Sequence, residues 1–168
     1  MIARTPTDDT DKLVTFDSRE QAGQLALALI EQARQEICFF GPIIDPVLLG
    51  SDTAVEKLSE FVRRSSRTFL RIVVHDTRKN VIDSHRLLPL AQKLTSSIKI
   101  QIAGRKHQDL RQQFMLIDGK AYLYCPVADY YQGRVERYAP AKVKVMQQDF
   151  EDIWNHSKPD INVRWLNL

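Results

Sequence analysis

The sequence predicts one α/β domain: a mixed, mostly parallel sheet with helices on both faces and one β-hairpin. Strand-like and helix-like segments alternate three times before residue 103, a rhythm typical of parallel strands joined by crossover helices. An Asp-Gly pair then separates two apolar runs and predicts the hairpin. The 168 residues, 43% of them hydrophobic, suffice for one domain with its own core. We expect a loose tail at 1–11 and a single domain at 12–168.

Two helices in the first half of the domain are marked by capping boxes. Ser18 and Gln21 can satisfy the free N–H groups at a helix start, and apolar residues follow at helical spacing. Thr53 and Glu56 predict a second start of the same kind. The elements expected up to residue 74 are a strand at 12–16, a helix at 18–35, a strand at 36–40, a loop at 43–51, a helix at 53–64 and a strand at 69–74.

The second half of the chain changes character after one more helix and strand. Asp118-Gly119 is the typical pair of a type I′ turn, in which both central residues have φ above zero. We expect Ile117 opposite Lys120, which puts Met115, Tyr122, Gln113 and Tyr124 on one face and Phe114, Leu116, Ala121 and Leu123 on the other. The elements expected here are a helix at 84–94, a strand at 97–102, a polar loop at 104–110, hairpin strands at 112–117 and 120–124, a loop at 126–140, a helix at 141–156 and a strand at 161–166.

Composition excludes several classes of protein. The longest apolar run, residues 25–30, is far short of the roughly 20 residues of a membrane span, and no apolar secretion signal begins the chain. Cys38 and Cys125 lie in apolar contexts without metal-ligand spacing, so we expect buried free thiols in a reducing cytoplasm, and neither a metal nor a cofactor. The formal net charge of +3 is too small for a dedicated nucleic-acid binder.

The segment from Arg111 to Lys120, Arg-Gln-Gln-Phe-Met-Leu-Ile-Asp-Gly-Lys, resembles the motif of the phospholipase D-like superfamily, His-x-Lys-x4-Asp, in which a strand ends in Asp-Gly. Weaker similarity extends to residues 36–40 and 150–154. The resemblance implies a three-layer sandwich. It also implies a histidine nucleophile, a phosphate-binding lysine and a Gly-Ser-x-Asn stretch, and a homodimer in which two single-motif domains pair across a two-fold axis.

The chain departs from that motif at the positions of the catalytic residues. Arg111 takes the histidine position, and a guanidinium, which stays protonated, is no nucleophile. Gln113 takes the lysine position, and residues 125–128 replace the Gly-Ser-x-Asn stretch. Asp118 alone remains, and turn geometry is sufficient to explain it. The sequence therefore predicts a vestigial site of Arg111, Gln113 and Asp118 that can hold an anion without cleaving it.

Two histidines are the alternative nucleophiles. His75 ends the strand at 69–74, and because strand ends of open α/β sheets face the ligand crevice, it is expected beside Arg111 and Gln113, or else as a hydrogen-bonded structural histidine. His107 requires a shifted register that places Asp109 at the lysine position, where it would repel phosphate.

Tyrosines and arginines gather around the hairpin and the loop after it. Tyr and Arg together suit a protein interface, but a tyrosine-rich loop that covers a sheet edge explains the pattern equally well. The candidate interface residues are Tyr122, Tyr124, Tyr130, Tyr131 and Arg134.

The preferred function is a non-catalytic phospholipase D-like domain that binds an anionic ligand or a partner protein. One alternative is a phosphodiesterase or nuclease-like enzyme with a rearranged site. A third, less favoured, is nucleic-acid binding without cleavage through Arg111, Arg105, Lys106 and the arginines at 63–71, which steep salt dependence would reveal.

Overall fold

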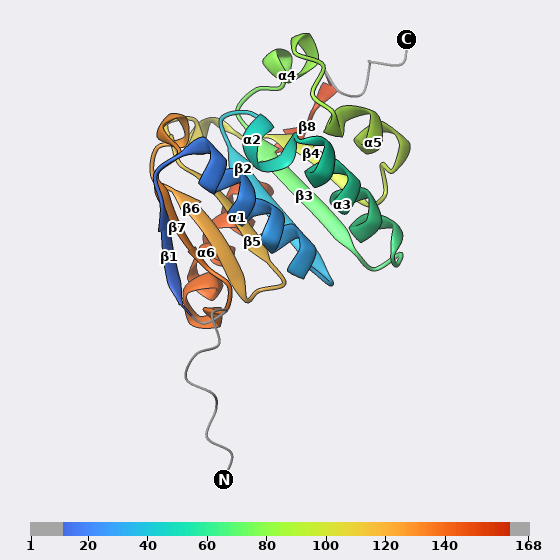
Figure 1. Ribbon diagram of the computed structural model, residues 1–168. Coiled ribbons are helices and arrows are strands. Elements are labelled where there is room, and N and C mark those ends of the chain that lie inside the picture. The colour runs from blue at the N-terminus through green and yellow to red at the C-terminus, as the bar shows by residue number, and fades with distance from the viewer. Residues whose placement is uncertain (1–11, 162–168) are drawn as a thin grey trace.

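The computed structural model describes residues 12–161 as a sheet between two layers of helices (Figure 1). The strands are β1 (Leu13–Phe16), β2 (Glu36–Gly41), β3 (Phe69–Val74), β4 (Ile98–Ile102), β5 (Gln113–Ile117), β6 (Ala121–Cys125), β7 (Gly133–Glu136) and β8 (Lys158–Pro159). The helices are α1 (Arg19–Gln32), α2 (Pro46–Leu49), α3 (Asp52–Arg63), α4 (Arg78–Ile82), α5 (Leu87–Lys93) and α6 (Pro140–Asn155), with short 3-10 turns η2 (Arg105–His107) and η3 (Ala128–Tyr130).

The sheet has the strand order β1-β7-β6-β5-β2-β3-β4-β8 and is mostly antiparallel, so the expected mostly parallel sheet is wrong. Only β2–β3 and β3–β4 are parallel among the described strand pairs. The α/β class itself holds. The parallel rhythm stops after β4 because residues 103–112 contain no crossover helix that could carry the chain back, and β5 therefore runs against β2.

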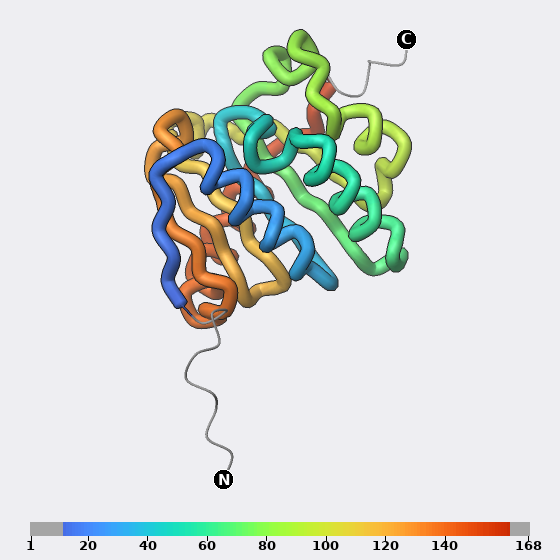
Figure 2. Tube along the Cα trace, in the orientation of Figure 1, coloured from blue at the N-terminus to red at the C-terminus, as the bar shows by residue number. Residues whose placement is uncertain are grey.

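Each face of the sheet has its own core, which agrees with helices on both faces (Figures 1 and 2). Side chains along β2 alternate between the two cores: Phe39 packs with the layer of α1, α2, α3 and α5, and Phe40 packs with α6. Both phenylalanines are fully buried. Within residues 12–161, α6 is the only helix with residues in the second core.

The hairpin has the predicted turn but not the predicted register. Asp118 and Gly119 have φ of 55° and 68°, and the Lys120 N–H donates to the Ile117 carbonyl at 2.8 Å. Ile117 pairs with Ala121 rather than Lys120, because the Lys120 carbonyl accepts from the Ala139 N–H at 2.7 Å and leaves the ladder. Tyr122 and Tyr124 therefore share a face with Phe114 and Leu116, toward α6.

Several element boundaries differ from the expectations. The Ser18–Gln21 cap is confirmed, but α3 is capped by Ser51 instead of Thr53. The helix expected at 84–94 is the shorter α5, and α4, which was not expected, precedes it, with Ser84 at φ 53° between the two. The loop expected at 126–140 contains β7, and the loop expected at 43–51 contains α2. Of the strand expected at 161–166, residue 161 is helical and the rest lies outside the described residues, as does the tail at 1–11.

Both cysteines are buried free thiols, as the sequence predicts. Burial raises the pKa of Cys125 to about 11, so this thiol stays protonated and unreactive at neutral pH. No helix within residues 12–161 is long and apolar enough to cross a membrane.

We expect acid to weaken the fold partly through His85, next to the α4–α5 break. Burial lowers the pKa of this imidazole below 6.5, and its Nδ1 must stay unprotonated to accept the Leu87 N–H at 3.1 Å. The unfolded chain therefore binds a proton that the folded chain excludes, so this stability is complete above pH 6.5 and falls as the pH drops below it. Urea unfolding of the wild type and His85→Gln between about pH 5 and pH 8 measures this. The variant should lose part of that dependence, and identical slopes for the two proteins would contradict the assignment.

Candidate functional site

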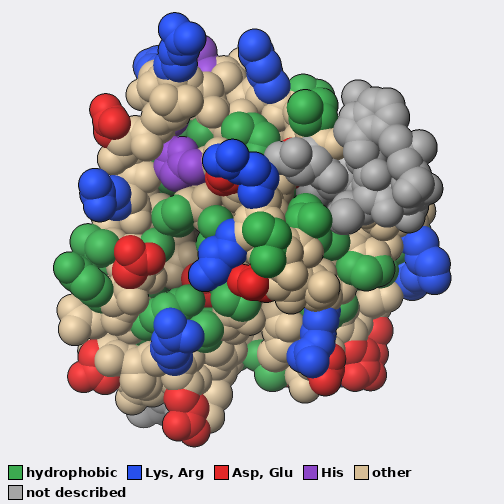
Figure 3. Space-filling view, turned by 90° about the horizontal axis from the view of Figure 1, so that it is seen from above, with side chains coloured by type: hydrophobic (Ala, Val, Ile, Leu, Met, Phe, Trp, Pro, Cys, Tyr) green, Lys and Arg blue, Asp and Glu red, His purple; other side chains and the backbone are tan. Residues whose placement is uncertain are grey.

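The residues of the vestigial motif begin at the end of the sheet where β2 and β3 finish and β5 starts. His75 follows β3, Gly41 ends β2, and Gln113 opens β5. Because β5 runs antiparallel to β2, its first residue lies beside the last residues of β2. We call Arg111, Gln113 and His75 the strand-end site, and Figure 3 looks onto this end of the molecule.

Gln113, which the resemblance to the phospholipase D-like motif places at the lysine position, is closed off from solvent. It is 0% exposed, and its Nε2 donates to the Ala128 carbonyl at 3.3 Å while its Oε1 has no partner. A Cβ on Gly41 would lie 3.2 Å from the Gln113 Cβ, so the space around the side chain is tightly filled. Gln113 therefore anchors the loop at Ala128 to the sheet and presents nothing to a ligand.

The space beyond Gln113 is occupied by a buried polar pair. Cys125 lies opposite Gln113 in the register. Asp45, 4% exposed, caps α2 through its Oδ1 and accepts the Tyr131 hydroxyl on Oδ2 at 2.8 Å. The Arg19 guanidinium covers the Tyr131 ring at 4.9 Å. The sequence analysis missed Asp45, although an Asp before a Pro and an apolar run is a recognisable helix start.

Arg111, which the resemblance to the phospholipase D-like motif places at the histidine position, lies on the surface. Its carbonyl accepts the Ala128 N–H at 3.0 Å, which fixes the backbone. The side chain is exposed and makes no hydrogen bond or ion pair with any residue between 12 and 161. The guanidinium is therefore available to an anion.

His75 shares the sheet end with Arg111 but not the face of Gln113. Its ring contacts Phe40, of the α6 core, edge-on at 5.5 Å, whereas Gln113 is the register partner of Cys125, which belongs to the other core. The His75 Nε2 donates to the Leu110 carbonyl at 2.8 Å, so this nitrogen carries the proton. These contacts favour the interpretation of His75 as a hydrogen-bonded structural histidine. His75 and Gln113 lie on opposite faces of the sheet.

His107, the other candidate nucleophile, is tied to α6. It is 8% exposed, and its Nε2 is 3.0 Å from an Asp152 carboxylate oxygen. Lys106 and His107 both bind Asp152 and hold the pKa of that carboxyl below its usual range. His107 therefore fastens the β4–β5 connection to α6.

Asp118 lies at the far end of β5 from Arg111, about 16 Å from Gln113 at 3.3 Å per strand residue. Its carboxylate accepts three backbone N–H groups, from Arg34, Gln35 and Glu36, each at 2.8 Å. This carboxylate joins the hairpin turn to the start of β2, and it is remote from the strand-end site.

The five candidate interface residues divide into two groups. Tyr122 and Tyr131 are buried, with hydroxyls bonded to Glu136 and Asp45, so they present no free surface. Tyr130 is 68% exposed, and the Arg134 guanidinium stacks over the half-buried Tyr124 ring at 4.6 Å.

Comparison with solved structures identifies the fold. TrmBL2, an archaeal chromatin protein described as binding DNA, matches with a TM-score of 0.66 at 10% identity, over 93% of this chain and 57% of that one. Nuc from Salmonella typhimurium, a phospholipase D family member, matches with 0.63 at 13% identity, over 89% and 97%. NucT from Helicobacter pylori matches with 0.62 at 10% identity, over 89% and 99%. This chain spans little more than half of the TrmBL2 chain, and identities this low establish the fold alone.

Comparison by sequence identifies the family. No curated protein matches the chain. A family model described as a domain of unknown function, DUF7931, matches residues 18–166. This protein therefore belongs to the DUF7931 family and has a phospholipase D-like α/β fold.

Proposed function

We propose that this protein is a non-catalytic phospholipase D-like module that binds an anionic group through Arg111. The observation that carries the proposal is the pair of residues at the motif: an exposed guanidinium that has no partner among residues 12–161 at the histidine position, and a fully buried glutamine at the lysine position. A guanidinium binds carboxylate or phosphate well and cannot attack it. Pairing of two copies across a two-fold axis, which the family resemblance implies, remains part of the proposal.

The other imidazoles support this interpretation. Nucleophilic catalysis on a phosphodiester needs an unprotonated ring nitrogen aimed at phosphorus and positive charge around the oxygens. The His75 Nε2 donates to a carbonyl, which leaves only Nδ1 unprotonated, and the His107 Nε2 bonds to Asp152. No lysine side chain hydrogen-bonds to either histidine within residues 12–161.

We expect no phosphodiesterase turnover and measurable anion binding. Turnover is measured on a chromogenic diester and on DNA, for the wild type, His75→Ala and His107→Ala. Binding of pyrophosphate is measured by calorimetry for the wild type and Arg111→Gln. The loss of a charged hydrogen bond should weaken binding about tenfold. Arg67→Gln, an exposed arginine before β3, is the matched control and should bind as the wild type does.

Two results would overturn the proposal. One is turnover that either histidine substitution abolishes, since this identifies a working nucleophile. The other is pyrophosphate affinity that is equal in the wild type and Arg111→Gln, or absent in both.

Nucleic-acid binding without cleavage is the second candidate, because TrmBL2 shares the fold over 93% of this chain. Figure 3 weighs against it at the strand-end face, where Lys and Arg side chains are scattered among acidic and apolar ones without a continuous basic patch. A gel shift with DNA that weakens steeply as the salt concentration rises would favour nucleic-acid binding. A shift that does not depend on salt, or no shift at all, would argue against it.

A further inference from the structure

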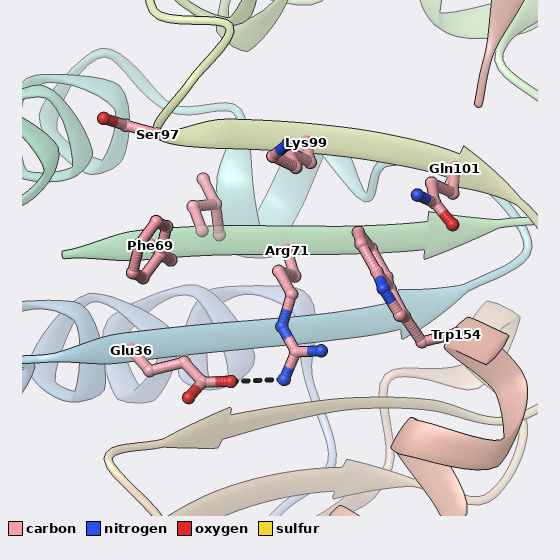
Figure 4. A pocket seen from close by; sticks show the side chains of 8 residues that line it. Glu36, Phe69, Arg71, Ser97, Lys99, Gln101 and Trp154 are labelled. Carbon is pink, nitrogen blue, oxygen red and sulfur yellow. Dashed lines mark hydrogen bonds and ion pairs between the residues drawn. The ribbon is translucent and has the colours of Figure 1, made fainter. Parts of the chain in front are cut away.

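A groove of about 530 Å³ lies on the α6 side of the sheet, over β3 and β4 (Figure 4). It is separate from the strand-end site, because none of Arg111, Gln113 and His75 lines it. The groove is open because α6 packs over β2, β5 and β6 and only its Trp154 reaches toward β4. The lining residues used below are Glu36, Phe69, Arg71, Lys99, Gln101 and Trp154.

The floor of the groove is an ion-pair cluster in which Arg71 bonds to two carboxylates. The Arg71 guanidinium bonds to Glu151 at 2.7 Å and to Glu36 at 2.5 Å. It also stacks against the rings of Phe150 and Trp154, at 5.1 and 5.2 Å. The Glu151 carboxylate raises the pKa of Arg71 and has its own pKa lowered in return, so both remain charged. Arg71 therefore holds the groove together and has no charge left for a ligand.

The β4 side of the groove carries polar groups that make no hydrogen bond or ion pair with residues 12–161. Lys99 lies opposite Arg71 in the register, is exposed, and makes no hydrogen bond or ion pair with residues 12–161. Gln101 accepts the Ser157 hydroxyl on its oxygen, which leaves its amide nitrogen free of hydrogen bonds in the described part of the chain. This side therefore offers one free positive charge and one free donor.

Aromatic rings lie toward the two ends of the groove. Phe69 is 42% exposed at the start of β3, and the half-buried Trp154 lies over Arg71 toward Gln101, as Figure 4 shows. Exposed aromatic faces in a hollow favour stacking with a flat ring, which can be worth about 1–3 kcal/mol per nucleic-acid base.

We propose that this groove binds a flat aromatic ring that carries a single anionic group. The ring stacks on Phe69, and the anion pairs with Lys99 and takes a hydrogen bond from the Gln101 amide. Glu36 and Glu151 both pair with Arg71, so Lys99 is the cation that remains for an anion among the described residues of the groove. A nucleoside monophosphate and an aryl carboxylate both have this chemistry.

The proposal is tested by NMR titration of the whole chain with four probes. Adenosine monophosphate and indole-3-acetate are the two sources of the proposed chemistry, adenosine lacks the anion, and inorganic phosphate lacks the ring. Both aromatic anions should shift the amide signals of β3 and β4 and the indole N–H of Trp154 at millimolar concentration. Whichever of the two aromatic anions binds with the higher affinity identifies the source of the ligand. Inorganic phosphate should leave these signals unchanged.

Three variants locate the binding. Lys99→Gln should weaken both aromatic anions roughly 5- to 10-fold and leave adenosine unchanged. Phe69→Thr should weaken every probe that has a ring. Lys93→Gln, an exposed lysine on α5 across the sheet, is the control and should change nothing. Phe69 and Lys99 are exposed, so the variants should keep the wild-type spectrum elsewhere. Arg111→Gln should not affect this groove, which separates a failure here from a failure of the proposed function.

The proposal is overturned if neither aromatic anion shifts the β3 and β4 signals at millimolar concentration. It is also overturned if Lys99→Gln and Lys93→Gln have equal effects on binding.

Discussion

Replacing Asp118 by alanine is expected to destabilise the fold by about 3 kcal/mol, since buried or half-buried charged hydrogen bonds are costly to remove. The substitution leaves the N–H groups of Arg34, Gln35 and Glu36 without their common acceptor. It also puts alanine at φ 55°, a conformation that Asp and Asn tolerate better. The free energy of unfolding is measured by urea denaturation at neutral pH.

Two further variants separate the causes of that loss. Asp118→Asn keeps the side chain that tolerates positive φ and one acceptor oxygen, so it should lose about half as much. Asp149→Ala, an exposed carboxylate on α6, should change stability by less than about 0.5 kcal/mol. If Asp118→Ala were as stable as the wild type and lost only anion binding, Asp118 would be a ligand-binding residue and its structural role would be wrong.

Replacing Gln113 by lysine, the residue of the phospholipase D-like motif that this segment resembles, is expected to cost about 3 kcal/mol of stability. The side chain is 0% exposed, and the carboxylate oxygens of the nearby Asp45 already accept hydrogen bonds from α2 and Tyr131. A lysine here must bury an ammonium without a partner or lose its proton. Gln112→Lys, one residue earlier and half-buried, is the matched control and should cost little.

The double variant Arg111→His/Gln113→Lys tests whether the motif alone is sufficient for catalysis. We expect no phosphodiesterase turnover, because residues 125–128 supply no Ser or Asn and the lysine is held away from the surface. Turnover of a chromogenic diester by this variant would show that the rest of the site is intact, which would contradict the account of Gln113 as a buried anchor.

Much of the local structure follows from short-range physics and could be predicted. The cap at Ser18 and Gln21 depends on residues three positions apart, and the positive φ values at Asp118 and Gly119 depend on the turn itself. The candidate site could be predicted only in part. The sequence places Arg111 and Gln113 where the motif that it resembles has His and Lys, but it does not show that Arg111 is exposed and Gln113 buried.

The amino-acid sequence by itself determined the α/β class, the cap at Ser18 and the turn at Asp118-Gly119, because helix caps, turn residues and alternating apolar runs act between near neighbours. Only the tertiary structure decided the strand directions, the hairpin register and the separation of His75 from Gln113. These depend on partners far apart in the chain. The Ala139 N–H donates to the Lys120 carbonyl, and the N–H groups of residues 34–36 donate to the Asp118 carboxylate. The His75 ring packs edge-on against Phe40. A one-residue shift in pairing reverses the face of every side chain that follows, and such a shift is set by long-range hydrogen bonds that local pattern does not contain.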